Sequence, residues 1–169
     1  ATTDPMNPDL DPLSSLETIL GYEFSRLDLL RRAVTHASAA TEAWNAYERL
    51  EFLGDRVLGL MVAEQLLGRF PREREGEIAR RHVQLVRKET LAEVSRRLGV
   101  GQFLLLSRGE EEAGARDSES ILADVMEAIL AALYLDGGLK AVRRFILSLI
   151  HNLRCRPPTS LAPPGAAER

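Results

Sequence analysis

Apolar residues recur at helical spacing through most of the chain, and no stretch of any length alternates strictly between apolar and polar positions. Apolar positions three or four residues apart are typical of a helix that buries one face, whereas strict alternation is typical of a strand. The pattern therefore predicts an all-α domain, a helical bundle without internal repeats. The predicted helices cover residues 16–20, 27–34, 47–70, 75–98, 121–135 and 139–153.

Residues with strong helix-start and helix-stop preferences set the expected boundaries. Hydroxyl side chains favour the N-cap, proline ends a helix before it, and glycine favours the position after the last turn. The expected caps and stops are Ser14 or Ser15, Ser25, Ser118 or Ser120, Pro71, Gly137 and Gly138. Residues 107–119 are polar and predict a loop. We expect a flexible arm over residues 1–13, one folded domain over 14–153 and a Pro-rich flexible tail over 154–169.

The longest predicted helix, residues 47–70, is the central helix of the bundle and carries acidic residues on one side. Glu48, Glu51 and Asp55 lie at i, i+3 and i+7, so at about 100° per residue they fall within about 60° of one another. Apolar residues fill the opposite side and continue the acidic side, which is typical of a buried helix. The residues expected on the opposite side are Leu50, Leu53, Val57, Leu60 and Met61. Because a buried charge needs a partner or a metal, the acids are candidate ligands.

A second segment repeats this arrangement. Asp124 and Glu127 are the only charged residues in the apolar stretch 121–135, and they lie one turn apart. Neither acidic segment carries a basic residue placed to neutralise its own acids. Packing the two helices face to face would gather four carboxylates, and one uncompensated buried ion costs several kcal/mol. The pattern therefore predicts a divalent metal, and ligation by oxygen alone favours magnesium, manganese or calcium over zinc.

The same two stretches carry a family resemblance. Residues 48–55 read ERLEFLGD and residues 123–128 read ADVMEA. Supporting matches follow the same order along the chain, at residues 35–36, 75–77, 107–111 and 134–138. Over roughly residues 16–149, the sequence strongly resembles the nuclease domain of ribonuclease III.

The resemblance implies an activity and a cofactor. It implies a fold of the ribonuclease III endonuclease domain and an endoribonuclease that hydrolyses double-stranded RNA, in RNA processing such as the maturation of ribosomal RNA precursors. The products would carry 5′-phosphate and 3′-hydroxyl ends. Glu51, Asp55, Asp124 and Glu127 would be the metal ligands, with Asp55 and Glu127 catalytic. Mg²⁺ would be the cofactor, Mn²⁺ a substitute, and no small-molecule cofactor is expected.

The resemblance also implies roles outside the ligand set. Glu48 and Glu75 resemble supporting carboxylates near the RNA or the dimer seam, although an acid at a helix start such as Glu75 is equally explained by the helix dipole. Phe52 resembles a residue that enters a pocket on the partner subunit of a homodimer. Arg56 stands where many relatives carry a small residue. At about 80° from Glu48 it lies off the acidic side, so we expect it to leave the site undisturbed.

Composition and charge agree with a single globular domain. The chain has 169 residues, 45% hydrophobic and 28% charged, with a net charge of −3, which is enough for a real core. All but two of the 22 basic residues are arginine, and several cluster between residues 72 and 97. Arginine suits phosphate contacts, but these residues are also explained as solvated helix faces and ion pairs. With one cysteine, no membrane span and no secretory pattern, we expect a cytoplasmic protein.

Alternatives to the nuclease are a non-catalytic double-stranded-RNA binder or dimerising scaffold, and a helical metal-binding protein without an RNA role. All six expected carboxylates are present, which favours the enzyme. Relatives usually continue into a double-stranded-RNA-binding domain, and we expect none to fold after residue 153. His36 follows a predicted helix, and we interpret it as a structural hydrogen-bonding residue outside the metal site.

Overall fold

The computed structural model describes residues 12–155, with side chains described through residue 149. Residues 1–11 of the expected arm and 156–169 of the expected tail lie outside the described part. The fold is all-α, as predicted. Its α-helices are α1 (Pro12–Leu20), α2 (Leu27–Ala33), α3 (Glu48–Arg69), α4 (Glu75–Val86), α5 (Lys88–Leu98), α6 (Arg108–Glu112) and α7 (Glu119–Cys155).

Short elements connect these helices. Residues 12–155 include four 3-10 helices: η1 (Ala37–Ala39), η2 (Ala43–Asn45), η3 (Val100–Phe103) and η4 (Ala115–Asp117). Within residues 12–155, β pairing is limited to one isolated parallel bridge between Thr35 and Leu105. None of the helices in this range combines the length and apolar character needed to cross a lipid bilayer.

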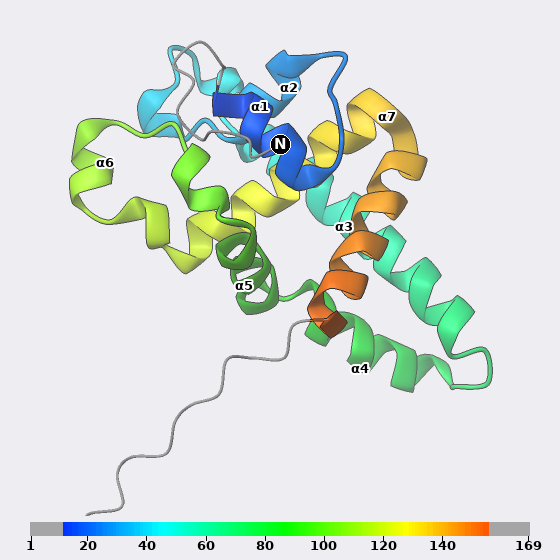
Figure 1. The fold of residues 1–169 in the computed structure, drawn as a ribbon. Helices are drawn as coiled ribbons and strands as arrows, with labels where there is room; N and C mark the ends of the chain where they lie inside the picture. Colours follow the sequence, from blue (N-terminus) through cyan, green and yellow to red (C-terminus); the bar gives the residue numbers. More distant parts are fainter. Residues whose placement is uncertain (1–11, 156–169) are drawn as a thin grey trace, which may run out of the picture.

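Helices α3 and α7 form the centre of the domain, and α2, α4 and α5 pack against one or both of them (Figure 1). Along α7, every residue from 122 to 133 is buried except Asp124, which is partly exposed. The predicted burial of the apolar segment 121–135 is therefore confirmed for residues 122–133, whereas Leu135 at its end is 45% exposed. An acidic side chain on such a helix can reach solvent only where a neighbouring helix leaves a gap.

A glycine allows the two central helices to approach closely. A Cβ built on Gly54 of α3 would lie 1.8 Å from the backbone carbonyl oxygen of Glu127 on α7. No side chain fits at that distance, so any larger residue would force the helices apart. Glu51 lies one turn before Gly54 and is therefore held beside the acidic turn of α7.

Gly138 interrupts α7, with φ 69° and ψ −172°. Positive φ is the conformation that glycine adopts without steric cost, and the break confirms the stop predicted at Gly137 and Gly138. Just before it, the Asp136 carboxylate accepts hydrogen bonds from the backbone N–H groups of Ser25 (3.0 Å) and Arg26 (2.9 Å) and from the Tyr22 hydroxyl (2.8 Å). These bonds fix the end of the first part of α7 to the start of α2.

Several helix starts differ from the prediction. Helix α1 begins at Pro12, before the expected serine caps, because proline lacks the N–H that the first turn leaves unpaired. Leu13, expected in the arm, is buried. The N-cap of α2 is Arg26 rather than Ser25. The predicted loop 107–119 contains α6 and η4, and Ser107 accepts a hydrogen bond from the backbone N–H of Glu110 at 3.4 Å.

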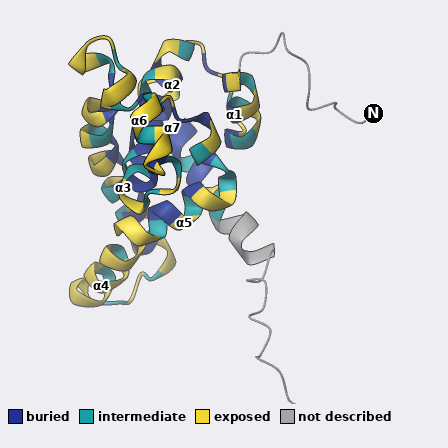
Figure 2. Cartoon of the chain, turned by 90° about the vertical axis from the view of Figure 1, so that its left-hand side faces the viewer, coloured by how far each residue is buried: buried dark blue, intermediate teal, exposed yellow. Residues whose placement is uncertain are grey.

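Helix α3 is buried on one side only, which corrects the expectation of a helix buried all round. Leu50, Val57 and Met61 are buried, but Leu60, expected beside them, is 54% exposed. Periodicity alone shows that α3 has apolar residues on two sides, and only one of these sides faces α7. Figure 2 shows the contrast between buried α7 and the mostly exposed α4.

Candidate metal centre

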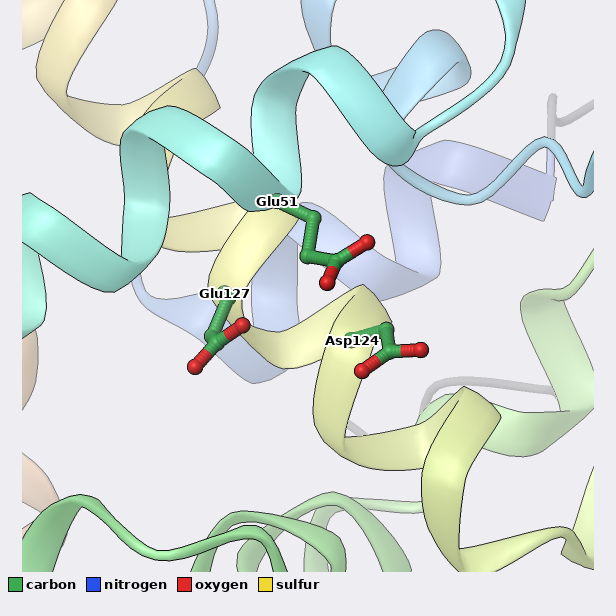
Figure 3. Close-up of side chains that lie close together, drawn as sticks. All are labelled: Glu51, Asp124 and Glu127. Carbon is green, nitrogen blue, oxygen red and sulfur yellow. The ribbon is translucent and has the colours of Figure 1, made fainter.

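Three carboxylates meet where α3 passes α7. Glu51 of α3 and Asp124 and Glu127 of α7 each offer one carboxylate oxygen, and these oxygens all lie within 4.8 Å of one another. In Figure 3 the three side chains extend from the two helices into the same space. The predicted face-to-face meeting of the two acidic segments thus brings together three of the four expected ligands.

Burial and like charge dominate the electrostatics of this group. Glu127 is only 7% exposed. Burial raises its pKa to about 7, and the charges of Asp55, Glu51 and Asp124 act in the same direction. The pKa of Glu51 is also raised, first by burial and then by the charge of Asp124. A cation among these oxygens would relieve the repulsion and favour the ionised carboxylates.

Asp55, the fourth expected ligand, lies outside this group of three. Its side chain is 54% exposed and accepts a hydrogen bond from Nη1 of Arg56 at 3.0 Å. Although Arg56 is expected off the acidic side, its long side chain folds back onto the preceding residue. The expectation that Arg56 leaves the site undisturbed stays a prediction. Of the carboxylate charges that raise the pKa of Glu127, that of Asp55 is nevertheless the largest single one, so Asp55 borders the centre.

Lys88 is a cationic neighbour that sequence reasoning missed. It is the first residue of α5, and its Nζ donates to Oδ1 of Asp124 at 2.8 Å. The Ser120 hydroxyl donates a hydrogen bond to the other oxygen of Asp124, Oδ2, at 3.5 Å. The expectation that neither acidic segment carries a basic residue placed to neutralise its own acids fails for Asp55, which pairs with Arg56 of the same helix. The counter-ion of Asp124 comes from a third helix, and no local pattern in the sequence signals that contact.

The family follows from comparison with known proteins. Residues 27–153 match a family described as ribonuclease-III-like. The chain belongs to the ribonuclease III family. It is 51% identical over 130 residues to the ribonuclease 3 of Dinoroseobacter shibae, an alignment covering 77% of this chain and 57% of the relative. With the ribonuclease 3 of Idiomarina loihiensis, identity is 41% over 158 residues, or 94% of this chain and 66% of the relative. The chain thus spans less than two thirds of these relatives.

Two solved structures share the fold of this chain. The nuclease domain of ribonuclease III from Campylobacter jejuni superposes with a TM-score of 0.79 at 38% identity, covering 83% of this chain and 96% of that one. Dicer from Pichia stipitis matches with a TM-score of 0.52 at 24% identity and supports the fold alone. The predicted fold of the ribonuclease III endonuclease domain is therefore confirmed.

The two expected supporting carboxylates lie at helix starts. Glu48 opens α3 and Glu75 opens α4, and both are exposed. The charge of Glu48 acts on Glu51, so it lies near the centre without belonging to the group of three. His36 caps η1, with its ring bonded to the backbone N–H of Ser38 at 3.2 Å. This capping contact fits the structural interpretation of His36.

Phe52 lies on the exposed side of α3. Its side chain is 64% exposed, and the guanidinium of Arg56 stacks 3.8 Å from the ring centroid. Leu60 (54% exposed) and Leu67 (63%) are also exposed along α3. These two leucines lie on the same side, seven residues or about two turns apart, and Phe52 lies about 80° around the helix from Leu60. We call Phe52, Leu60 and Leu67 the outer face of α3. An exposed apolar face of this kind is typical of an interaction surface.

Part of the arginine cluster forms ion pairs. Arg81 donates to both carboxylate oxygens of Glu73, at 2.8 and 2.6 Å, and Arg97 pairs with Glu93. The ion-pair interpretation therefore holds for these arginines, whose charges are partly committed within the chain.

Proposed function

We propose that this chain is the nuclease domain of a divalent-metal-dependent endoribonuclease that hydrolyses phosphodiesters in double-stranded RNA and leaves 5′-phosphate and 3′-hydroxyl ends. The observation that carries the proposal is the group formed by Glu51, Asp124 and Glu127 in a member of the ribonuclease III family. The relatives from Dinoroseobacter shibae and Idiomarina loihiensis, both named ribonuclease 3, support the same activity.

Magnesium is the metal that best suits the donors, with manganese as a substitute. All candidate ligands are carboxylate oxygens, which hard cations prefer and which zinc sites seldom use alone. The raised pKa values of Glu127 and Glu51 come from burial and from like charges, and a cation offsets both. The residues present therefore fit a magnesium ion.

Each residue of the centre has a role in this proposal. Glu51, Asp124 and Glu127 would hold the ion, and Asp55 would complete the set from the solvent side. When bound, magnesium supplies activation of a water and stabilisation of charge on the phosphate. The packing of Gly54 against the Glu127 backbone fixes the ligands of α3 and α7 relative to each other. Asp55 and Glu127 are the catalytic residues that we propose.

A second copy of the chain is the partner that we propose for the outer face of α3. Phe52, Leu60 and Leu67 present apolar surface that a monomer leaves in water, and aromatic anchors dominate many interfaces. The description of a solved structure of the Campylobacter jejuni domain reports structural flexibility in a region involved in dimer formation. A two-fold dimer would place one centre on each strand of an RNA duplex, with Glu48 and Glu75 supporting the RNA-facing side.

Digestion of a long RNA duplex beside its two separate strands tests this function. We expect cleavage of the duplex in Mg²⁺, none in EDTA, and 5′-phosphate ends on the products. The separate strands should be cut poorly, since the A-form duplex is recognised by its shape. Duplex binding without cleavage in Mg²⁺ would instead identify a non-catalytic binder and contradict the proposal.

A further inference from the structure

Lys88 reaches into the acidic group from a third helix. Its Nζ lies 2.8 Å from Oδ1 of Asp124, and Asp124 offers an oxygen to the three-carboxylate group. We propose that Lys88 is a tethered cation that competes with the divalent metal for the acidic group and so lowers the metal affinity of the centre. The inference rests on the proposed function, because it presumes that the group binds a metal.

Lys88 is much more exposed than Asp124, as expected for a cation that can give way to a metal. The side chain of Lys88 is 57% exposed, whereas that of Asp124 is 14% exposed. Lys88 also stands at the joint between α4 and α5, directly after Arg87, whose backbone is extended at ψ 153°. The flexible four-carbon stem of lysine can therefore move to solvent without unpacking a helix, while Asp124 stays fixed on α7.

The charge of Lys88 acts on the whole group rather than on Asp124 alone. Its ammonium interacts electrostatically with Glu51 and Glu127 as well, in each case opposing the repulsion among the carboxylates. That is the effect a metal ion would have. Two cations within a few ångströms repel each other strongly even at an effective dielectric constant of about 20. Binding of the metal therefore requires the ammonium to withdraw.

Titration with Mn²⁺, counting the free ion by electron paramagnetic resonance, measures the competition without relying on cleavage. We expect Lys88→Met to bind Mn²⁺ about tenfold more tightly than the parent. Lys88→Arg keeps a cation and should bind less tightly than Lys88→Met. Lys140→Met changes the one other lysine of the sequence, an exposed residue beyond the break in α7, and should match the parent. Equal or weaker binding by Lys88→Met would overturn the inference.

Thermal unfolding provides a second reading, because at a given ligand concentration a tighter-binding ligand raises the unfolding temperature more. Lys88→Met should unfold below the parent in EDTA, since it loses a counter-ion of the acidic group, and should gain more from saturating Mg²⁺. An equal gain would contradict the competition. If the parent shows no saturable Mn²⁺ binding, the proposed metal centre itself fails. Normal parent binding with an unchanged Lys88→Met variant refutes only the role of Lys88.

Discussion

The backbone carbonyl oxygen of Glu127 occupies the place of a side chain at Gly54, because a Cβ built there would lie 1.8 Å away. The residue whose carboxylate is a proposed ligand thus has its backbone at a close contact between α3 and α7. The proposed metal centre is therefore positioned by the packing of two central helices rather than by a loop. Rigid elements of this kind hold ligands more precisely than loops do.

Gly54→Ala should destabilise the protein strongly. The new methyl group would meet backbone atoms, which cannot rotate away, so we expect the free energy of unfolding to fall by about 3 kcal/mol or more. Gly68→Ala is the matched control on the same helix, because a Cβ there has nothing within 4 Å. It should lie within about 1 kcal/mol of the parent or be slightly more stable. Urea unfolding measures both variants, and equal stabilities would contradict the account.

Phe52→Ala should weaken dimerisation without unfolding the monomer. The ring is mostly exposed, so its removal leaves the core intact, but it removes the proposed anchor of the outer face of α3. We expect the free energy of dimerisation to become less favourable by about 2 kcal/mol or more, measured by analytical ultracentrifugation. Trp44→Ala, another exposed aromatic position, is the control and should leave the dimer unchanged. A parent chain that is monomeric at micromolar concentration would refute the assembly itself.

Glu127 should make the stability of the protein depend on pH when EDTA is present. Its pKa of about 7 in the folded state exceeds its ordinary value of 4.5, so its stabilising contribution is complete below about pH 4.5 and is lost as the pH rises through 7. Glu127→Gln carries no such proton. Above pH 7 it should be more stable than the parent by about 1–3 kcal/mol, with a smaller difference near pH 4. If urea unfolding at pH 8 shows Glu127→Gln to be less stable than the parent, the prediction is contradicted, because the buried charge of Glu127 would then not destabilise the fold.

The sequence was sufficient to predict the helical fold and the two acidic segments. Helical periodicity placed Glu51 on α3 and Asp124 with Glu127 on one turn of α7, because these relationships lie within single helices. The absence of an obvious counter-ion suggested the face-to-face packing of the two segments, and the resemblance added the ligand assignment and the activity. The Lys88–Asp124 contact could not be predicted, since it joins residues 36 positions apart through the packing of α5 on α7.

Two further differences have a common physical origin. Periodicity shows that a residue such as Leu60 is apolar and on a given side of its helix, but not whether that side meets the core or solvent. Angles around a helix axis likewise describe Cβ directions, so they missed the reach of the long Arg56 side chain back to Asp55. Both differences concern what lies beside a helix, which depends on tertiary packing and on side-chain conformation.

The cleavage rate of Glu127→Gln on an RNA duplex at limiting Mg²⁺ tests the central claim most directly. Glutamine keeps the shape of the side chain and removes its charge, and Glu48→Gln makes the same change at an exposed acid outside the group of three. With unchanged circular dichroism and duplex binding, Glu127→Gln should lose about 100-fold or more in rate, and Glu48→Gln less than about tenfold. Cleavage by Glu127→Gln at the parent rate would contradict the metal centre.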